Sequence, residues 1–205
     1  MTMAGSNPAQ GTRTVTTAVI VWLLAAIIAG ASGFFRHIQP PLPQAVLLGL
    51  VVVQLLIFAF SSGFRNWCLS VDVRALLFFH VTRFVGVYFL ILYSQGRLPY
   101  DFAVPGGWGD IVTAAAVVIL VLLVKPAGKT AWMLYLVWNL YGFLDILFVV
   151  MTAARLAFSE PGSMSELLRL PLNLLLTFVV PVIIFTHIVI FIRLFRSGKR
   201  CYQLI

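Results

Sequence analysis

The chain alternates between long apolar runs and short polar breaks. Six runs each approach the ~20 residues that a helix needs to cross a bilayer; they cover residues 15–35, 43–63, 76–95, 109–125, 130–153 and 171–195. Proline, glycine and charged residues gather in the breaks, where a helix can end among headgroups or water. The pattern therefore predicts an all-α integral membrane bundle of six transmembrane helices.

The breaks are short. They read PPLP at 40–43, RNWCLSVDVR at 65–74, GRLPYDFAVPGGWG at 96–109, KPAGK at 125–129 and SEPGSMSELLR at 159–169. None is long enough to fold as a soluble domain. We therefore predict an N-terminal tail over residues 1–14, a single membrane domain over 15–195 and a basic C-terminal tail over 196–205.

Composition supports a membrane environment. The 205 residues are 61% hydrophobic and 10% charged, whereas soluble proteins are about 45–50% apolar and about 25% charged. The net charge of +8 does not indicate nucleic-acid binding, because the basic residues lie between and after the apolar runs and no polar domain concentrates them. The expected partner is the lipid bilayer.

The basic residues predict an orientation, because cytoplasmic segments carry the excess of lysine and arginine. With both termini in the cytoplasm, that side holds nine basic residues: Arg13, Arg65, Arg74, Lys125, Lys129, Arg193, Arg196, Lys199 and Arg200. The outer side holds four: Arg36, Arg97, Arg155 and Arg169. This asymmetry favours cytoplasmic termini.

The first apolar run has a second interpretation. VIVWLLAAII followed by AGA at 29–31 fits the apolar stretch and cleavage site of a signal peptide. Cleavage would leave five spans and the same orientation for the rest. Against it, the run continues through Phe34 and Phe35, and only Arg13 precedes it.

Several polar residues interrupt the runs. They are Gln54, His80, Arg83, Asn139, Asp145, Asn173 and His187. A charge at the bilayer centre costs about 2.5–3.5 kcal/mol on insertion scales, so these side chains should face other helices or a cavity. At ~1.5 Å per residue, Arg83, Asn139 and His187 share one layer of the bundle. Gly86 and Gly142 should let helices approach closely, and Pro181 should kink the last helix and free a carbonyl.

Arg83 needs a partner inside the bundle. Asp145 lies about 9 Å away in estimated depth, a separation that a long arginine and some helix tilt nearly close. Asp110 lies farther out. One interpretation is a buried polar clamp that includes His80, Arg83, Asn139, Asp145 and His187. The other is a substrate or proton site made of the same residues.

The segment LPYDFAVPGGWGD at 98–110 predicts an outer loop. Its prolines stiffen the chain, its glycines permit tight turns, and Tyr100, Asp101 and Trp108 suit the membrane interface. Asp110 would then cap the fourth helix, where a carboxylate complements the helix dipole. The loop either fastens the chain at its re-entry into the membrane or covers an outward cavity.

Two intramembrane histidines raise the question of haem b, which bundles hold between a histidine pair. His80 and His187 differ by about 4 Å in estimated depth, and opposed axial ligands should nearly match. We predict no metal site, because no cluster of histidine and carboxylate has ligand spacing. Nor does a nucleophile motif indicate an enzyme. Cys68 and Cys201 have no metal spacing and are expected to be reduced and incidental.

Three stretches carry a resemblance: FHVTRFVGVYFLILYSQGRLPYDFAVPGGWGDI from 79, WNLYGFLDILFVV from 138 and LPLNLLLTFVVPVIIFTHI from 170. Over about residues 76–190 the chain resembles uncharacterised bacterial multi-pass membrane proteins. The resemblance implies a compact helical fold in the bacterial inner membrane and carries no activity. The predicted function is a small multi-pass membrane protein of unknown activity that handles a solute or proton, as a transporter or permease, rather than performing catalysis. The alternatives are a non-catalytic subunit or assembly factor of a membrane complex, with a homo-oligomer among the partners, and a haem b electron carrier.

Overall fold

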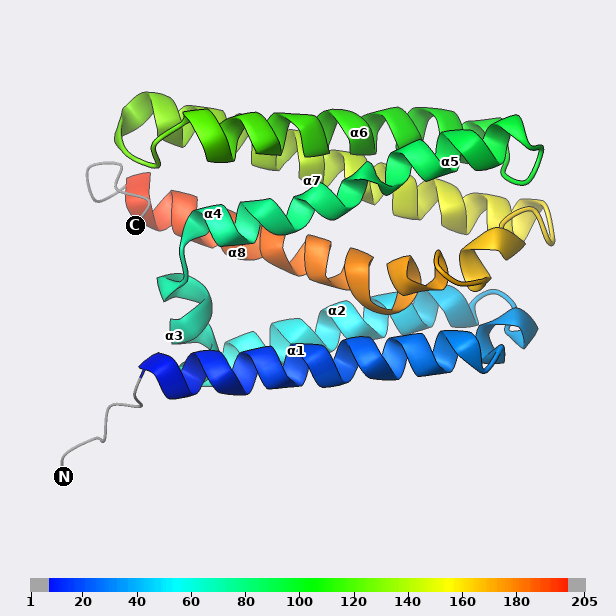
Figure 1. Ribbon diagram of the computed structural model, residues 1–205, viewed down its shortest axis with the longest axis horizontal. Helices are drawn as coiled ribbons and strands as arrows, with labels where there is room; N and C mark the ends of the chain where they lie inside the picture. Colours follow the sequence, from blue (N-terminus) through cyan, green and yellow to red (C-terminus); the bar gives the residue numbers. More distant parts are fainter. Residues whose placement is uncertain (1–7, 199–205) are drawn as a thin grey trace.

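A computed structural model describes residues 8–198 of the chain (Figure 1). The longer helices are α1 (Pro8–Ala31), α2 (Leu42–Phe60), α5 (Val85–Ser94), α6 (Tyr100–Leu123), α7 (Gly128–Ser159) and α8 (Val180–Gly198). Shorter elements connect or extend them: η1 (Phe34–His37), α3 (Ser62–Ser70), α4 (Val73–Phe78), η2 (Phe79–Phe84), η3 (Ser165–Leu168) and η4 (Leu175–Val179). The described residues contain no strand.

Six stretches are long and apolar enough to cross a membrane: Gly11–Ala31, Leu42–Phe60, Val73–Ser94, Tyr100–Leu123, Gly128–Ser159 and Leu175–Arg196. The predicted all-α bundle with six spans is confirmed by length and composition, which supports a multi-pass membrane protein. α1 already begins at Pro8, inside the predicted N-terminal tail. Of the predicted C-terminal tail, Lys199, Arg200 and Cys201 lie outside the described residues.

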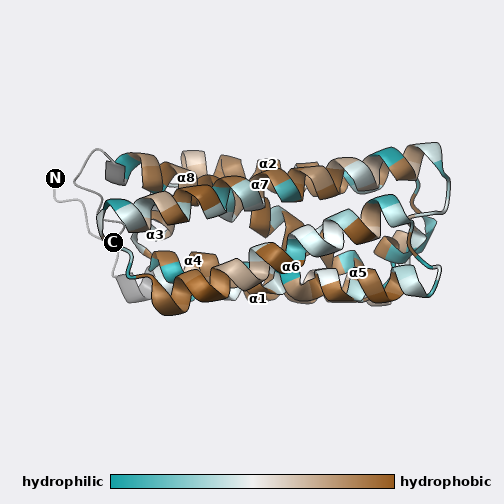
Figure 2. Cartoon of the chain, turned by 90° about the horizontal axis from the view of Figure 1, so that it is seen from above, coloured by the Kyte–Doolittle hydropathy of each residue, from teal (hydrophilic) through white to brown (hydrophobic). Residues whose placement is uncertain are grey.

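Both ends of the described chain lie at one end of the bundle (Figure 1). We call this the terminal end; it also holds α3 and the turn between α6 and α7. The opposite, distal end holds η1, η3 and the turn that joins α5 to α6. Hydrophobic residues dominate the helices between the two ends (Figure 2), as expected of segments surrounded by lipid.

The prediction of a loop over residues 96–109 is wrong for most of these residues. α6 starts at Tyr100, so LPYDFAVPGGWGD is helical from that residue onward. Pro105 lies in the second turn, where it removes a single backbone hydrogen bond. Gly106, Gly107 and Gly109 are buried helical positions rather than turn residues. Close helix packing, which the pattern of proline and glycine does not reveal, explains the difference.

The third span is not a continuous α-helix. α4 ends at Phe78, the six residues of η2 form a 3-10 helix, and α5 resumes at Val85. A 3-10 helix has three residues per turn, so side chains three positions apart align along it. His80 and Arg83 have that separation and are both buried. The 3-10 segment thus directs both side chains into the bundle.

α8 forms the centre of the bundle and α1 lies at its edge. In the span that ends with α8, 61% of the most apolar window is buried, against 11% in the span of α1. α2, α4 and α7 all pack on α8. Large exposed side chains such as Val21, Leu122 and Met151 instead cover the outer surface. In a membrane this outer surface contacts lipid rather than water.

Pro181 determines how α1 attaches. As a proline it has no amide hydrogen to donate to the carbonyl of Thr177, four residues earlier. The preceding residues form a π-helix, η4. The indole nitrogen of Trp22 in α1 donates to the Thr177 carbonyl at 3.0 Å, and its ring packs edge-on against Phe178. The carbonyl predicted to be freed therefore accepts a hydrogen bond from α1.

Two glycines bring α5 and α6 into backbone contact. A Cβ built on Gly86 would lie 2.3 Å from the carbonyl oxygen of Gly107. One built on Gly107 would lie 2.9 Å from the carbonyl oxygen of Gly86. Neither backbone can move away without separating the helices, so only glycine fits at both positions. The predicted close approach at Gly86 is confirmed.

We expect Gly86→Ala to destabilise the protein by about 1–3 kcal/mol, the usual cost of overpacking. The reason is that the added methyl group meets backbone, which cannot rotate away as a side chain does. The measurement is thermal unfolding of the detergent-solubilised protein. Gly49→Ala in α2 is the matched control, because a Cβ there meets nothing within 4 Å. Equal unfolding temperatures for the two variants would contradict the close approach.

The connection between α2 and α4 contains the short helix α3 and the buried thiol of Cys68. Ser61 begins α3 by accepting a hydrogen bond from the Phe64 amide. Cys68 is 1% exposed and packs against Phe185 and Val189 of α8. Burial raises the pKa of the Cys68 thiol to about 12. The thiol therefore stays protonated and unreactive through neutral pH.

We expect maleimide at pH 8 to leave Cys68 unmodified in the folded Cys201→Ser protein and to modify it rapidly after denaturation in SDS. The measurement is the mass shift of the intact protein over time. Ser70→Cys, an exposed position of the same helix, is the control and should react fully in the folded state when Cys68 and Cys201 are replaced by serine. Rapid modification of Cys68 before denaturation would show that the thiol is accessible.

Candidate functional site

Arg83 lies at the centre of a buried ion cluster. Its Nε donates to Asp110 Oδ1 at 2.6 Å, its Nη2 donates to Asp145 Oδ2, and its Nη1 donates to the carbonyl of Gly142 at 2.7 Å. The arginine side chain is 1% exposed, that of Asp110 4% and that of Asp145 11%. The cluster therefore joins η2, α6 and α7 through one guanidinium group.

Glycines make room for this cluster. A Cβ built on Gly109 would lie 1.8 Å from Asp145 Oδ1. One built on Gly142 would lie 2.9 Å from both Thr113 Cγ2 and His187 Cε1. Any larger residue at either position would displace a polar side chain. Gly109 of α6 thus makes room for the Asp145 carboxylate that reaches Arg83, and Gly142 of α7 makes room for Thr113 and His187.

A histidine pair lies beside the cluster. The rings of His80 and His187 have centroids 4.3 Å apart and are tilted by 57°. Thr186 Oγ1 lies 3.1 Å from His80 Nε2. His187 Nδ1 lies 2.8 Å from Asn139 Oδ1, and the Asn139 amide donates to the His187 carbonyl. The second ring nitrogens, His80 Nδ1 and His187 Nε2, have no hydrogen-bond partner in the described chain.

The histidine pair does not fit haem b in this arrangement. Axial ligands must stand on opposite faces of a flat macrocycle, whereas these two rings contact each other. Trp138 and Phe143 also pack around the pair, so the macrocycle has no space there. Within residues 8–198, no group of three or more His, Cys, Asp or Glu residues could hold a metal ion.

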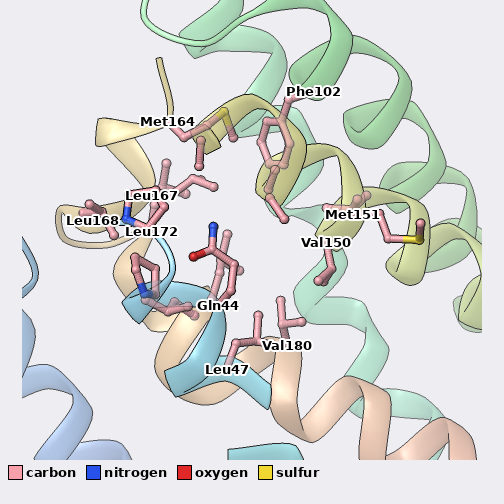
Figure 3. Close-up of a pocket in the computed structure, with 18 of the residues that line it drawn as sticks. Gln44, Leu47, Phe102, Val150, Met151, Met164, Leu167, Leu168, Leu172 and Val180 are labelled. Atoms are coloured by element: carbon pink, nitrogen blue, oxygen red, sulfur yellow. The ribbon is translucent and has the colours of Figure 1, made fainter. Parts of the chain in front are cut away.

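A cavity of about 800 Å³ extends from the distal end to the cluster. Arg36 and Gln39 line it near the distal end, and Arg83 and Asp110 line it near the middle of the bundle. Most of its wall is apolar and comes from α2, α5, α7, η3 and α8. Figure 3 shows the side chain of Gln44 pointing into this space. The cavity thus gives the ion cluster a connection toward one end of the protein.

The terminal half of the bundle contains a buried apolar core. Nine buried residues pack there into one core cluster: Val73, Leu77, Val117, Leu120, Ala131, Tyr135, Trp138, Ile190 and Leu194. They come from α4, α6, α7 and α8 and lie between the histidine pair and the terminal end. The cavity thus lies on the distal side of the ion cluster, and this apolar core lies on its terminal side.

The structure brings together the five residues predicted to form an intramembrane polar site. His80, Arg83 and Asn139 are at most 1% exposed, as is His187; Asp145 joins them through Arg83. The predicted ion pair of Arg83 with Asp145 is present in the structure.

The residues predicted for the outer loop and the helix cap lie within helix α6. Asp110 does not cap a helix: it lies inside α6, is 3% exposed and pairs with Arg83. Tyr100 and Trp108 are exposed positions of α6 rather than of a loop. Asp101 lies in the first turn of α6 and pairs with Arg155 of α7 on the surface. The error has one cause, the late start predicted for the fourth helix.

Other contributors gave weaker signals in the sequence. Thr186 adjoins His187 and contacts His80, but threonine is unremarkable in a membrane helix. Gln44 lies in the first turn of α2, where it resembles an ordinary interfacial residue. Gly109 was read as a turn residue. A helix that began at Tyr100 in the prediction would have placed Gly109 and Asp110 inside the bundle.

A family model described as Domain of unknown function (DUF8737) matches residues 40–195. The chain belongs to this family. The matched residues include the whole polar cluster and the cavity wall except for its Arg36–Gln39 portion, and they leave α1 outside. No curated protein and no solved structure matches the chain.

We expect Arg83→Leu to destabilise the protein by about 3–5 kcal/mol, because it leaves two buried carboxylates without their counter-charge. Replacing all three groups, by Arg83→Met, Asp110→Asn and Asp145→Asn together, should recover much of that loss. Thermal unfolding in detergent measures both effects.

Arg155→Leu is the matched control. Its ion pair with Asp101 is more than half exposed on both sides, and such pairs contribute about 0–1 kcal/mol. A fully folded and stable Arg83→Leu protein would contradict the clamp interpretation and leave the cluster with a purely functional role.

Proposed function

We propose that this protein is a small membrane transporter in which a solute or a proton reaches the Arg83–Asp110–Asp145 cluster from the distal end. The observation that carries the proposal is the cavity that connects the distal end with Arg83 and Asp110. The packed core on the other side of the cluster supports a state that is open toward one side only, as alternating access requires.

The charges of the cluster support proton exchange. One guanidinium faces two carboxylates, so the fully ionised cluster has a net charge of −1. Binding one proton makes it neutral, and an uncompensated charge is expensive inside a bundle. The other titratable groups nearby are His80, His187 and Tyr141.

The distribution of basic residues supports an orientation for this transporter. Arg36, Arg97, Arg155 and Arg169 belong to the distal end, and most other basic residues belong to the terminal end. By the positive-inside rule the terminal end faces the cytoplasm. We place the protein in a bacterial inner membrane with both termini cytoplasmic, so that the cavity faces outward.

A second function has one observation in its favour. Arg83 uses all three of its nitrogens in hydrogen bonds, as a residue that only holds helices together would. That arrangement suits a non-catalytic subunit or assembly factor of a membrane complex. Transport differs from this role in one measurable respect, because only a transporter moves protons or solute when it is alone in a membrane.

The test is proton uptake by proteoliposomes that contain a pH-sensitive dye, driven by a potassium diffusion potential. We expect uptake faster than in protein-free liposomes, and a loss of at least tenfold in Asp145→Asn. This variant keeps the shape of the side chain and removes the more exposed of the two carboxylates that pair with Arg83.

Asp101→Asn is the matched control, since Asp101 is an exposed carboxylate outside the cavity. It should leave uptake within about twofold of the unmodified protein. If the unmodified protein gives the same uptake as protein-free liposomes, the proton path is wrong. If both variants reduce uptake equally, the cluster has no special part in it.

A further inference from the structure

The cavity opens sideways as well as toward the distal end. Leu48 of α2 and Met151 of α7 both line it, yet Leu48 is 57% exposed and Met151 70% exposed on the outside of the bundle. α2 and α7 each pack on α8 and flank the cavity from opposite sides. The cavity therefore reaches the surface that faces lipid, and a molecule dissolved in the membrane can enter between these two helices.

The cavity is polar near the distal end and apolar below it. Arg36, Gln39 and Gln44 contribute polar groups from η1 and the start of α2. Leu47, Val180 and Ile183 form part of the apolar wall nearer the centre of the bundle. This order matches a membrane amphiphile in its normal orientation, with the head at the interface and the chain in the hydrocarbon layer.

Gln44 indicates the chemistry of the head. Its Oε1 is buried and accepts no hydrogen bond within the described chain. The side chain points into the cavity (Figure 3), so a half-turn of its amide, which exchanges Oε1 with Nε2, brings the acceptor to the cavity. A buried acceptor without a donor costs about 1–3 kcal/mol, so a donor from the ligand would be favourable. A hydroxyl group supplies one without bringing a charge into an apolar cavity.

The volume limits the size of the ligand. Cavities of about 300–1,000 Å³ hold molecules of drug size, and this cavity of about 800 Å³ accommodates one chain rather than a complete phospholipid with two. Arg36 at the distal end is exposed, and Arg83 near the middle of the bundle is paired with Asp110, so neither places a buried, uncompensated cation in the cavity that would select an anionic head.

We propose that the cavity binds a single-chain amphiphile with a hydroxyl head, such as a long-chain alcohol, which enters from the lipid between α2 and α7. This amphiphile would be the substrate of the transporter proposed above. Only its transport, and not its binding, rests on that proposed function. Binding itself is independent of transport.

The test is photolabelling of the full-length protein in phosphatidylcholine nanodiscs with a diazirine-bearing hexadecanol. After irradiation, mass spectrometry locates the labelled residues. We expect labelling concentrated on cavity residues such as Leu47, Val180 and Ile183, and displacement by excess unlabelled hexadecanol. Even labelling of all lipid-facing helices, without displacement, would overturn the proposal.

Two variants sharpen the result. Ala157→Trp fills the cavity from α7 and should reduce labelling at least tenfold, whereas Ala115→Trp, at an exposed position of α6 outside the cavity, should leave it unchanged. Gln44→Leu should reduce hexadecanol affinity about tenfold but leave the affinity for a diazirine-bearing hexadecane unchanged. Equal effects on both probes would show that no hydrogen bond at Gln44 selects the head.

The binding and proton-uptake experiments fail separately. Displaceable labelling of the cavity combined with background proton uptake would keep the amphiphile site and remove the transporter. Proton uptake that depends on Asp145, with no displaceable labelling, would keep the transporter and overturn the substrate class.

Discussion

One arginine buried in a membrane bundle constrains most of this structure. The side chain of Arg83 is only 1% exposed, so the chain must bring it counter-charge and hydrogen-bond acceptors. Two carboxylates from α6 and α7 and a backbone carbonyl do so. This requires three helices to meet at one point, closer than ordinary side chains permit. This close approach requires glycine at positions 86, 107 and 109, because a Cβ at Gly86, Gly107 or Gly109 would collide with an atom of a neighbouring helix.

Two irregular segments of the spans orient polar groups. η2 interrupts the third span where His80 and Arg83 must both face inward. η4 interrupts the approach to α8, and Trp22 of α1 satisfies a carbonyl that Pro181 leaves free. Regular α-helices would direct these groups less favourably. η2 thus lies at the polar centre, and η4 lies where α1 attaches to the last span.

Sequence reasoning succeeded where a strong physical cost acted on a single residue. The cost of burying polar groups identified Arg83 and His187 as residues that face other helices or a cavity, and the small size of glycine identified Gly142 as a site of close helix approach. It failed at residues 100–110, because proline and glycine mark both turns and close helix contacts. Nothing local distinguishes the two, so Asp110 was assigned to a helix end. The cavity was beyond prediction, since its wall comes from six separate segments whose arrangement depends on the whole fold.

The central position of α8 has a consequence for the biogenesis of the protein. Among the described helices, α8 is the last that the ribosome delivers, yet it is the most deeply buried. Until it is inserted, α2, α4 and α7 lack the helix on which they pack. His80 and Asn139 then lack Thr186 and His187 as partners. The bundle can therefore assemble completely only after α8 has been translated. In the interval, the insertion machinery or lipid must shield those polar groups.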